Sequence, residues 1–201
     1  QAAGSGGGEA LLPTENVTMG MMSSYEPRWP GAVELNLADQ WRARWVDEQE
    51  LPANAPVDRV YSMVCMGDHG FATREPGTTR WEMLDAAAGE GEGEGDPESL
   101  IRVVAELQTG VTARRVELIG FFECKATRHN PDCEAGTITV RPFYLVIGKQ
   151  VADLADGAPF ERRRMRMAEY MVAMRARYPE FEEYIGQGAL RYAVLRARGE
   201  A

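Results

Sequence analysis

The residues whose types and spacing best suit chemistry lie in the run Cys-Met-Gly-Asp-His-Gly at positions 65–70. A strand end followed by a tight turn would present the thiol of Cys65, the carboxylate of Asp68 and the imidazole of His69 together. A cysteine nucleophile needs a base within hydrogen-bond reach and a third group that orients the base, and a local run establishes neither. We therefore interpret Cys65 as a buried thiol before a turn. Cys65 and His69 are the catalytic pair to test if the protein is an enzyme.

A second set of reactive side chains surrounds a predicted hairpin loop and comprises Cys124, His129, Asp132 and Cys133. Their spacing matches none of the paired patterns in which short loops position metal ligands, so we expect ordinary hairpin residues and no metal site. A local bridge between Cys124 and Cys133 is one alternative. Because the chain has 3 cysteines, they cannot all pair with each other, and reduced thiols are the default expectation.

The sequence offers few residues and motifs for other kinds of catalysis. The chain has 2 histidines, which limits general acid–base or zinc chemistry built on imidazole. It contains no GxxxxGK(S/T), strand-linked GxGxxG or GxSxG run, so neither a phosphate-cradling loop nor a hydrolase elbow is predicted. Carboxylates are plentiful, but no pair stands out from the acidic background. The sequence therefore leaves any cofactor undetermined.

Charge divides the chain into an acidic majority and a basic C-terminal part. The formal net charge of -9 over 201 residues argues against binding to nucleic acid, which depends on neutralising phosphates. Four arginines interrupt the acidic background on a predicted helix, opposite a methionine-rich stripe: Arg162, Arg163, Arg164 and Arg166. They form either a solvated helix face that pairs with neighbouring glutamates or a surface that docks an anionic partner or a lipid surface.

The N-terminal residues 1–32 predict an irregular arm, because Gly and Ser fill the tip and three prolines interrupt the rest. This arm is unusually apolar for a solvated linker, which predicts packing on its own domain or on other protein chains. The residues expected to bind a partner are Leu11, Leu12, Met19, Met21, Met22 and Trp29. No apolar run approaches the length of a membrane span, so a soluble or peripheral protein is expected. An organellar location after removal of a targeting peptide remains an alternative.

Short sequence patterns predict the helices and strands that position these candidate residues. Asn36 as an N-cap, with Trp41 and Trp45 one helical turn apart, predicts a helix that ends before Pro52. A second helix is predicted to start at Asp96 and to stop at Gly110. Apolar runs predict strands over 59–66, 79–84, 115–128 and 137–147, and a Gly/Glu run predicts an acidic loop over 89–95.

Together these signals predict one α+β domain over 33–201. Its expected core is an antiparallel sheet with helices packed on one face, followed by a helical C-terminal region that breaks at Tyr178-Pro179. The absence of a catalytic motif and the apolar arm favour a non-catalytic accessory subunit of a larger assembly. The alternative is a small-molecule-binding domain with an apolar pocket beside the sheet, lined by residues such as Phe122, Phe143, Tyr144 and Trp81. The third hypothesis is an enzyme that uses Cys65 and His69.

Overall fold

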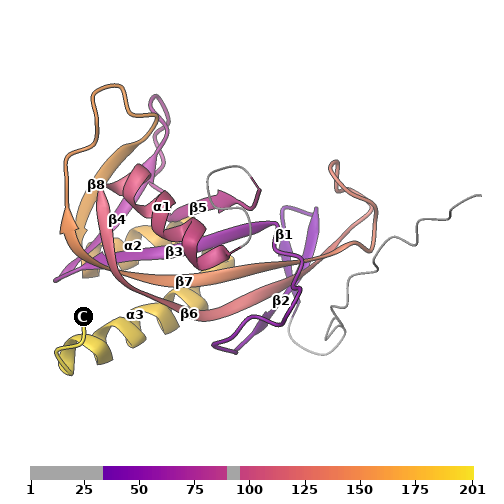
Figure 1. Ribbon diagram of the computed structural model, residues 1–201. Coiled ribbons are helices and arrows are strands. Elements are labelled where there is room, and N and C mark those ends of the chain that lie inside the picture. Colours follow the sequence, from indigo (N-terminus) through magenta and orange to yellow (C-terminus); the bar gives the residue numbers. More distant parts are fainter. Residues whose placement is uncertain (1–33, 90–95) are drawn as a thin grey trace, which may run out of the picture.

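The computed structural model describes residues 34–89 and 96–201 (Figure 1). The predicted arm, its apolar residues and most of the acidic loop lie outside these ranges. In the described part the strands are β1 (Glu34–Leu37), β2 (Trp41–Val46), β3 (Arg59–Met66), β4 (His69–Arg74), β5 (Leu84–Ala87), β6 (Val111–Ala126), β7 (Ile138–Val151) and β8 (Glu161–Arg166). The helices are α1 (Pro97–Thr109), α2 (Met167–Arg177), the 3-10 turn η1 (Pro179–Phe181) and α3 (Glu182–Ala197).

The strands form one mixed sheet in the order β1-β2-β6-β7-β3-β4-β8, and β5 pairs with β3. Every pairing is antiparallel except that of β3 with β7, which is parallel. The predicted α+β class is confirmed. The expectation of an antiparallel sheet is wrong for its centre, because β3 and β7 run parallel to each other.

Helices cover both faces of the sheet rather than one. On β3, Val64 lies in the apolar cluster under α1, whereas Cys65 lies in the cluster under α2 and α3. On β7, Val146 and Ile147 divide between the same two clusters. Side chains alternate across a strand, so a strand that is apolar at successive positions needs a cover on each side. The prediction of helices on one face is therefore wrong, and the molecule is a helix–sheet–helix sandwich.

Local signals set the ends of α1 as the sequence predicted. The side chain of Asp96 accepts hydrogen bonds from the backbone N–H groups of Glu98 and Ser99, at 3.3 and 3.0 Å. Gly110 follows the helix with φ of 69°, a left-handed conformation in which its N–H donates to the carbonyl of Glu106 at 2.8 Å. These caps define the two ends of α1, whereas its buried residues Leu100, Ile101 and Val104 pack it against the sheet.

The predicted helix after Asn36 is instead the hairpin of β1 and β2. The side-chain oxygen of Asn36 accepts a hydrogen bond from the N–H of Asp39 at 3.0 Å, the contact that an N-cap would make. Ala38 and Asp39 have positive φ values of 53° and 59°, however, so this contact closes a turn. Residues four apart share a face in a strand as well as in a helix, which explains why Trp41 and Trp45 misled the prediction.

The arginine run lies on a strand rather than on the predicted helix. Residues 161–166 form β8, which pairs antiparallel with β4. Met165 is buried between exposed arginines, which is the alternation of a strand that is covered on one face. Helix α2 starts only at Met167, and the predicted break at Tyr178-Pro179 is confirmed. No helix in the described ranges is long and apolar enough to cross a membrane.

Candidate active-site cleft

A cleft of about 630 Å³ opens on the face of the sheet that α2, η1 and α3 cover. Tyr61 of β3 and Arg141 of β7 form part of its floor. Its walls come from the β1–β2 hairpin with Trp41, the β6–β7 loop with Cys133, and the end of α2 with Tyr178. Segments far apart in the sequence therefore meet here.

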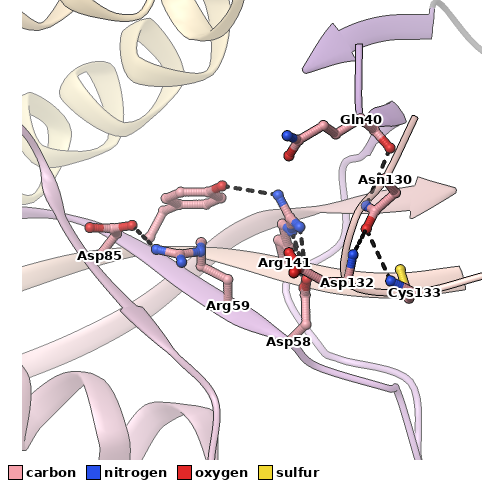
Figure 2. A network of polar contacts seen from close by, with 9 residues as sticks. Gln40, Asp58, Arg59, Asp85, Asn130, Asp132, Cys133 and Arg141 are labelled. Atoms are coloured by element: carbon pink, nitrogen blue, oxygen red, sulfur yellow. Dashed lines mark hydrogen bonds and ion pairs between the residues drawn. The ribbon is translucent and has the colours of Figure 1, made fainter. Parts of the chain in front are cut away.

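Arg141 is the most buried charged residue that lines the cleft. Its Nε and Nη2 atoms donate to the carboxylate of Asp58 at 3.0 and 2.7 Å, and its Nη1 lies 3.4 Å from the hydroxyl of Tyr61 (Figure 2). The guanidinium carbon also lies 4.5 Å from the ring centroid of Trp41, in a cation–π contact. Desolvation alone would lower the pKa of Arg141, but the hydrogen bonds and charge of Asp58 raise it above its ordinary value. Arg141 therefore stays protonated, and the Asp58 carboxylate balances its charge within the cleft.

Two further guanidinium–carboxylate pairs line the same cleft. Arg59 donates to Asp85 on the neighbouring strand β5, in a close contact that Figure 2 shows. The Nε of Arg177, near the end of α2, donates to Glu82 at 3.1 Å. Desolvation raises the pKa of the Asp85 carboxyl above its ordinary value, and Arg59 opposes this shift only in part. Asp85 is thus a carboxylate that binds a proton more readily than most.

Hydrogen bonds fix the loop that forms one wall. The side-chain oxygen of Asn130 accepts from the N–H groups of Asp132 and Cys133, at 2.9 and 3.2 Å (Figure 2). The side-chain amide of Asn130 donates to the carbonyl of Gln40 at 3.4 Å, which ties the β6–β7 loop to the β1–β2 hairpin. Thr139, beside this loop, lines the cleft with a buried hydroxyl that finds no partner among the described residues.

The structure does not bring Cys65 and His69 together. Cys65 is fully buried in the cluster under α2 and α3, and desolvation raises its pKa far above the ordinary value. On β4, Phe71 lies in the cluster under α1, so His69, two residues earlier, lies on that same face. The imidazole nitrogen of His69 contacts Asp68 and Arg164. The thiol and the imidazole thus lie on opposite faces of the sheet.

The four arginines predicted to bind a partner lie at the far edge of the sheet, away from the cleft. Arg162 donates to the carbonyls of Thr109 and Ala152, at 2.7 and 2.6 Å. Arg163 pairs with Glu169, Arg164 contacts His69, and Arg166 lies 3.8 Å from Asp68. Leu11, Leu12, Met19, Met21, Met22 and Trp29 lie outside the described residues.

The loop residues considered as metal ligands do not converge. Cys124 is fully buried, and desolvation raises its pKa to about 12. Cys133 is partly exposed at the cleft rim, and both thiols are free. His129 contacts the neighbouring Arg128 through its Nε2 atom. Within residues 34–89 and 96–201, no group of three or more His, Cys, Asp or Glu side chains could hold a metal ion.

The residues expected to line an apolar pocket are instead packed in the interior or covered. Phe122 and Phe143 are fully buried, and the ring of Phe122 stacks on Phe181 with centroids 4.6 Å apart. Tyr144 lies in the cluster on the opposite face, under α1. Trp81 is covered by the guanidinium of Arg74, 4.4 Å from its ring centroid. The four residues predicted to line an apolar pocket therefore do not line this cleft.

The charged residues of the cleft were missed by the sequence analysis. Arg141 offered one signal, because it shares a strand face with Phe143 and Leu145, and an arginine on an apolar face requires a buried partner. Its partner Asp58 lies 83 positions away in the sequence, and nothing local points to it.

No protein-family model and no curated protein matches the sequence. Among solved structures, the chain is similar to a mutant of the Bacillus subtilis pyrophosphohydrolase, with a TM-score of 0.51 and 12% identity over 66% of this chain and 77% of that chain. The NUDIX domain of Shewanella oneidensis NrtR, complexed with ADP ribose, gives a TM-score of 0.48 and 13% identity over 69% and 89%. An ADP compounds hydrolase gives 0.41 and 15% over 84% and 94%.

These comparisons correct the leading functional prediction. The sequence favoured a non-catalytic accessory subunit, and this prediction is wrong, because a structural neighbour with a TM-score of 0.51 is an enzyme. At 12% identity the similarity concerns the fold alone. The described chain has the sandwich fold of a pyrophosphohydrolase.

Proposed function

We propose that the protein hydrolyses a pyrophosphate bond in a compound that also carries a planar ring, and that it does so in this cleft. The observation that carries the proposal is the convergence of Arg59, Arg141 and Arg177 between aromatic side chains, in a fold shared with a pyrophosphohydrolase. Function on a shared fold must be argued from the site. The chemistry of these side chains supports a phosphate ligand.

Two of the arginines are placed to contact substrate. The side chains of Arg59 and Arg177 are 39% and 34% exposed, whereas that of Arg141 is 9% exposed. A guanidinium has five N–H donors in a planar fork, so each pair leaves donors for a phosphate oxygen. Arg59 and Arg177 would bind the two phosphates, and Arg141 would hold the floor in place. Charge that develops on the phosphates during cleavage would be stabilised by the same groups.

Asp85 is the carboxylate best suited to activate water. Its raised pKa makes it a stronger base than an ordinary aspartate, and Arg59 fixes its position. In the proposed step, water attacks one phosphorus while Asp85 accepts a proton. The new P–O bond forms as the bridging P–O bond breaks, and the departing phosphate carries the bonding electrons. A phosphate on Arg59 would weaken the Arg59–Asp85 pair and so strengthen Asp85 as a base.

Aromatic side chains supply a binding surface for a planar ring. Trp41, Tyr178 and Phe181 line the cleft, and the rings of the last two stack with centroids 6.0 Å apart. Stacking of a base on an aromatic side chain contributes about 1–3 kcal/mol to binding. The ring is therefore expected to lie toward Trp41 and Tyr178 while the phosphates lie toward the arginines.

The described residues do not fit a metal ion as they are arranged. Phosphoryl transfer commonly uses magnesium held by carboxylates and by the substrate phosphates. Of the five carboxylates that line the cleft, those of Asp58, Glu82 and Asp85 are each bonded to a guanidinium. Among the described residues, no group of three or more His, Cys, Asp or Glu side chains could hold a metal ion. We therefore derive no step through a metal.

A neighbouring hollow is a poorer candidate for the same substrate. It has a volume of about 680 Å³, but its charged lining consists of Arg175 and the carboxylates of Glu180, Glu182 and Glu183. Net charge does not separate the two sites, because the arginine cleft also has two more carboxylates than arginines. The cleft is the better candidate because it offers three guanidinium groups, rather than one, that can donate to phosphate oxygens.

The proposal is tested by incubating the full chain with ADP ribose and following phosphate esters by phosphorus NMR. Asp85→Asn should lower kcat by at least about 100-fold if Asp85 is the base. Arg177→Gln should raise KM or lower kcat/KM by about 10- to 100-fold, because a hydrogen bond to a charged group is lost. Arg102→Gln is the matched control, since Arg102 pairs with Glu98 on the surface of α1. Absence of both binding and cleavage, or activity that Asp85→Asn and Arg177→Gln leave unchanged, would overturn the proposal.

A further inference from the structure

Strand β8 is an edge strand, because among the described strands it pairs with β4 alone. Figure 1 shows β8 beside β4, at the opposite end of the sheet from β1. An edge strand presents a row of backbone N–H and C=O groups that can pair with another chain. The side chains around those groups decide which chain can approach.

The outward backbone groups of β8 belong to alternate residues. The N–H of Met167 donates to the carbonyl of Asp68 at 2.8 Å, so residue 167 faces β4. In an antiparallel ladder the backbone groups of successive residues point to opposite sides. Arg163 and Met165 therefore face β4, whereas Arg162 and Arg164 direct their N–H and C=O groups away from the sheet. Arg166 directs its N–H away from the sheet, but as the N-cap of α2 its C=O accepts the first hydrogen bond of that helix.

The same alternate arginines share one face of the strand. Met165 is buried in the cluster under α2 and α3, so the side chains of Arg162, Arg164 and Arg166 lie on the other face. Arg162 is held by the carbonyls of Thr109 and Ala152. Arg164 is exposed and contacts the imidazole of His69, and the Arg166 side chain is 81% exposed with Asp68 at 3.8 Å. Two cations thus stand beside open backbone groups.

We infer that this edge accepts an extended acidic segment of a partner protein by strand addition. Directly opposed side chains on neighbouring strands lie about 5 Å apart, within reach of a guanidinium–carboxylate pair. Carboxylates at alternate positions of the added strand would therefore meet Arg164 and Arg166. A second copy of β8 is a poor partner, because it would place arginines against arginines. The inference is independent of the proposed hydrolase activity, because the cleft lies elsewhere on the sheet.

The probe is a fluorescein-labelled peptide of alternating glutamate and valine, titrated with the full chain and followed by fluorescence anisotropy. Arg164→Glu and Arg166→Glu should each weaken binding at least about tenfold, because like charges oppose each other. Arg163→Glu is the matched control: its side chain lies on the other face and pairs with Glu169 at 2.6 Å. It should change the affinity by less than about threefold. Equal weakening by Arg163→Glu and Arg164→Glu would mean non-specific charge attraction and would overturn the inference.

Proline at position 166 tests the backbone pairing separately from charge. The φ of Arg166 is -58°, which proline adopts without strain, and its N–H does not bond to β4. Arg166→Gln removes the charge, and Arg166→Pro also removes the outward N–H. Arg166→Pro should bind the peptide about fivefold more weakly than Arg166→Gln, with unchanged thermal unfolding of the chain. Equal affinities, no saturable binding, or tighter binding of oligothymidylate than of the peptide would overturn the inference.

Discussion

Removal of the Asp58 carboxylate should leave the guanidinium of Arg141 buried without its partner. The pair has side-chain exposures of 30% for Asp58 and 9% for Arg141, and loss of one partner from a buried ion pair costs about 3–5 kcal/mol. Partial exposure of Asp58 and the remaining contacts of Arg141 with Tyr61 and Trp41 reduce this cost. We expect Asp58→Ala to lower the free energy of unfolding by about 2–3 kcal/mol.

Urea unfolding followed by tryptophan fluorescence measures this change. Calorimetry should show a fall in Tm of about 8 °C, since 1 kcal/mol shifts a domain of this size by about 2–4 °C. Glu98→Gln is the control, because Glu98 and Arg102 form an exposed pair on α1 with side-chain exposures of 46% and 40%. Exposed pairs contribute about 0–1 kcal/mol, so the control should unfold nearly as the wild type does.

A second substitution separates the ion pair from other effects of the Asp58 change. Replacing both partners, as Asp58→Ala with Arg141→Met, removes the stranded charge and should recover part of the lost stability. A loss in Asp58→Ala no larger than that in Glu98→Gln would refute the reasoning. So would a double variant less stable than Asp58→Ala alone.

Three further predictions follow from the same structure. Among the three cysteines, Cys133 alone should react rapidly with a thiol reagent in the folded protein, because the other thiols are fully buried; mass spectrometry of the modified peptide checks this. Gly120→Ala should destabilise the protein by about 1–3 kcal/mol in urea unfolding, because the added methyl would overlap the ring of Trp45 and no open space exists there. The pH profile of kcat/KM should rise with pH through an apparent pKa above 3.8, the ordinary value for an aspartate, because Asp85 must lose its proton to act as a base and its pKa is raised. Asp85→Asn should abolish that rising limb, and a limb that persists would remove Asp85 from the role.

Local signals predicted some elements well and misread others for a physical reason. Helix α1 was predicted from Asp96 and Gly110, because capping and a left-handed stop depend on a few adjacent residues. The β1–β2 hairpin was misread, because Trp41 and Trp45 share a face in either periodicity. Strand β8 was misread as a helix, because the pairing with β4 that determines it lies far away in the sequence.

The cleft could not be assembled from the sequence. Its ion pairs join residues that are 26, 83 and 95 positions apart in the sequence. The local sequence around each charged residue therefore does not distinguish it from an ordinary surface residue. The parallel pairing of β3 with β7 brings Tyr61 and Arg141 to one floor, and that register is set by the whole sheet. The prediction of a Cys65–His69 pair failed because proximity in the sequence did not mean proximity in space. The side chains of neighbouring strand residues point to opposite faces of the sheet, which separates the thiol from the imidazole.

The most direct test of the proposed active site is an NMR spectrum of the arginine side-chain N–H groups during titration with a methylene diphosphonate analogue of a nucleoside diphosphate. The account predicts saturable shifts of the Nε–H signals of Arg59 and Arg177, while the signal of Arg102 stays in place. Signals of Arg59 and Arg177 that do not move while the analogue binds, or shifts confined to Arg164 and Arg166, would contradict it.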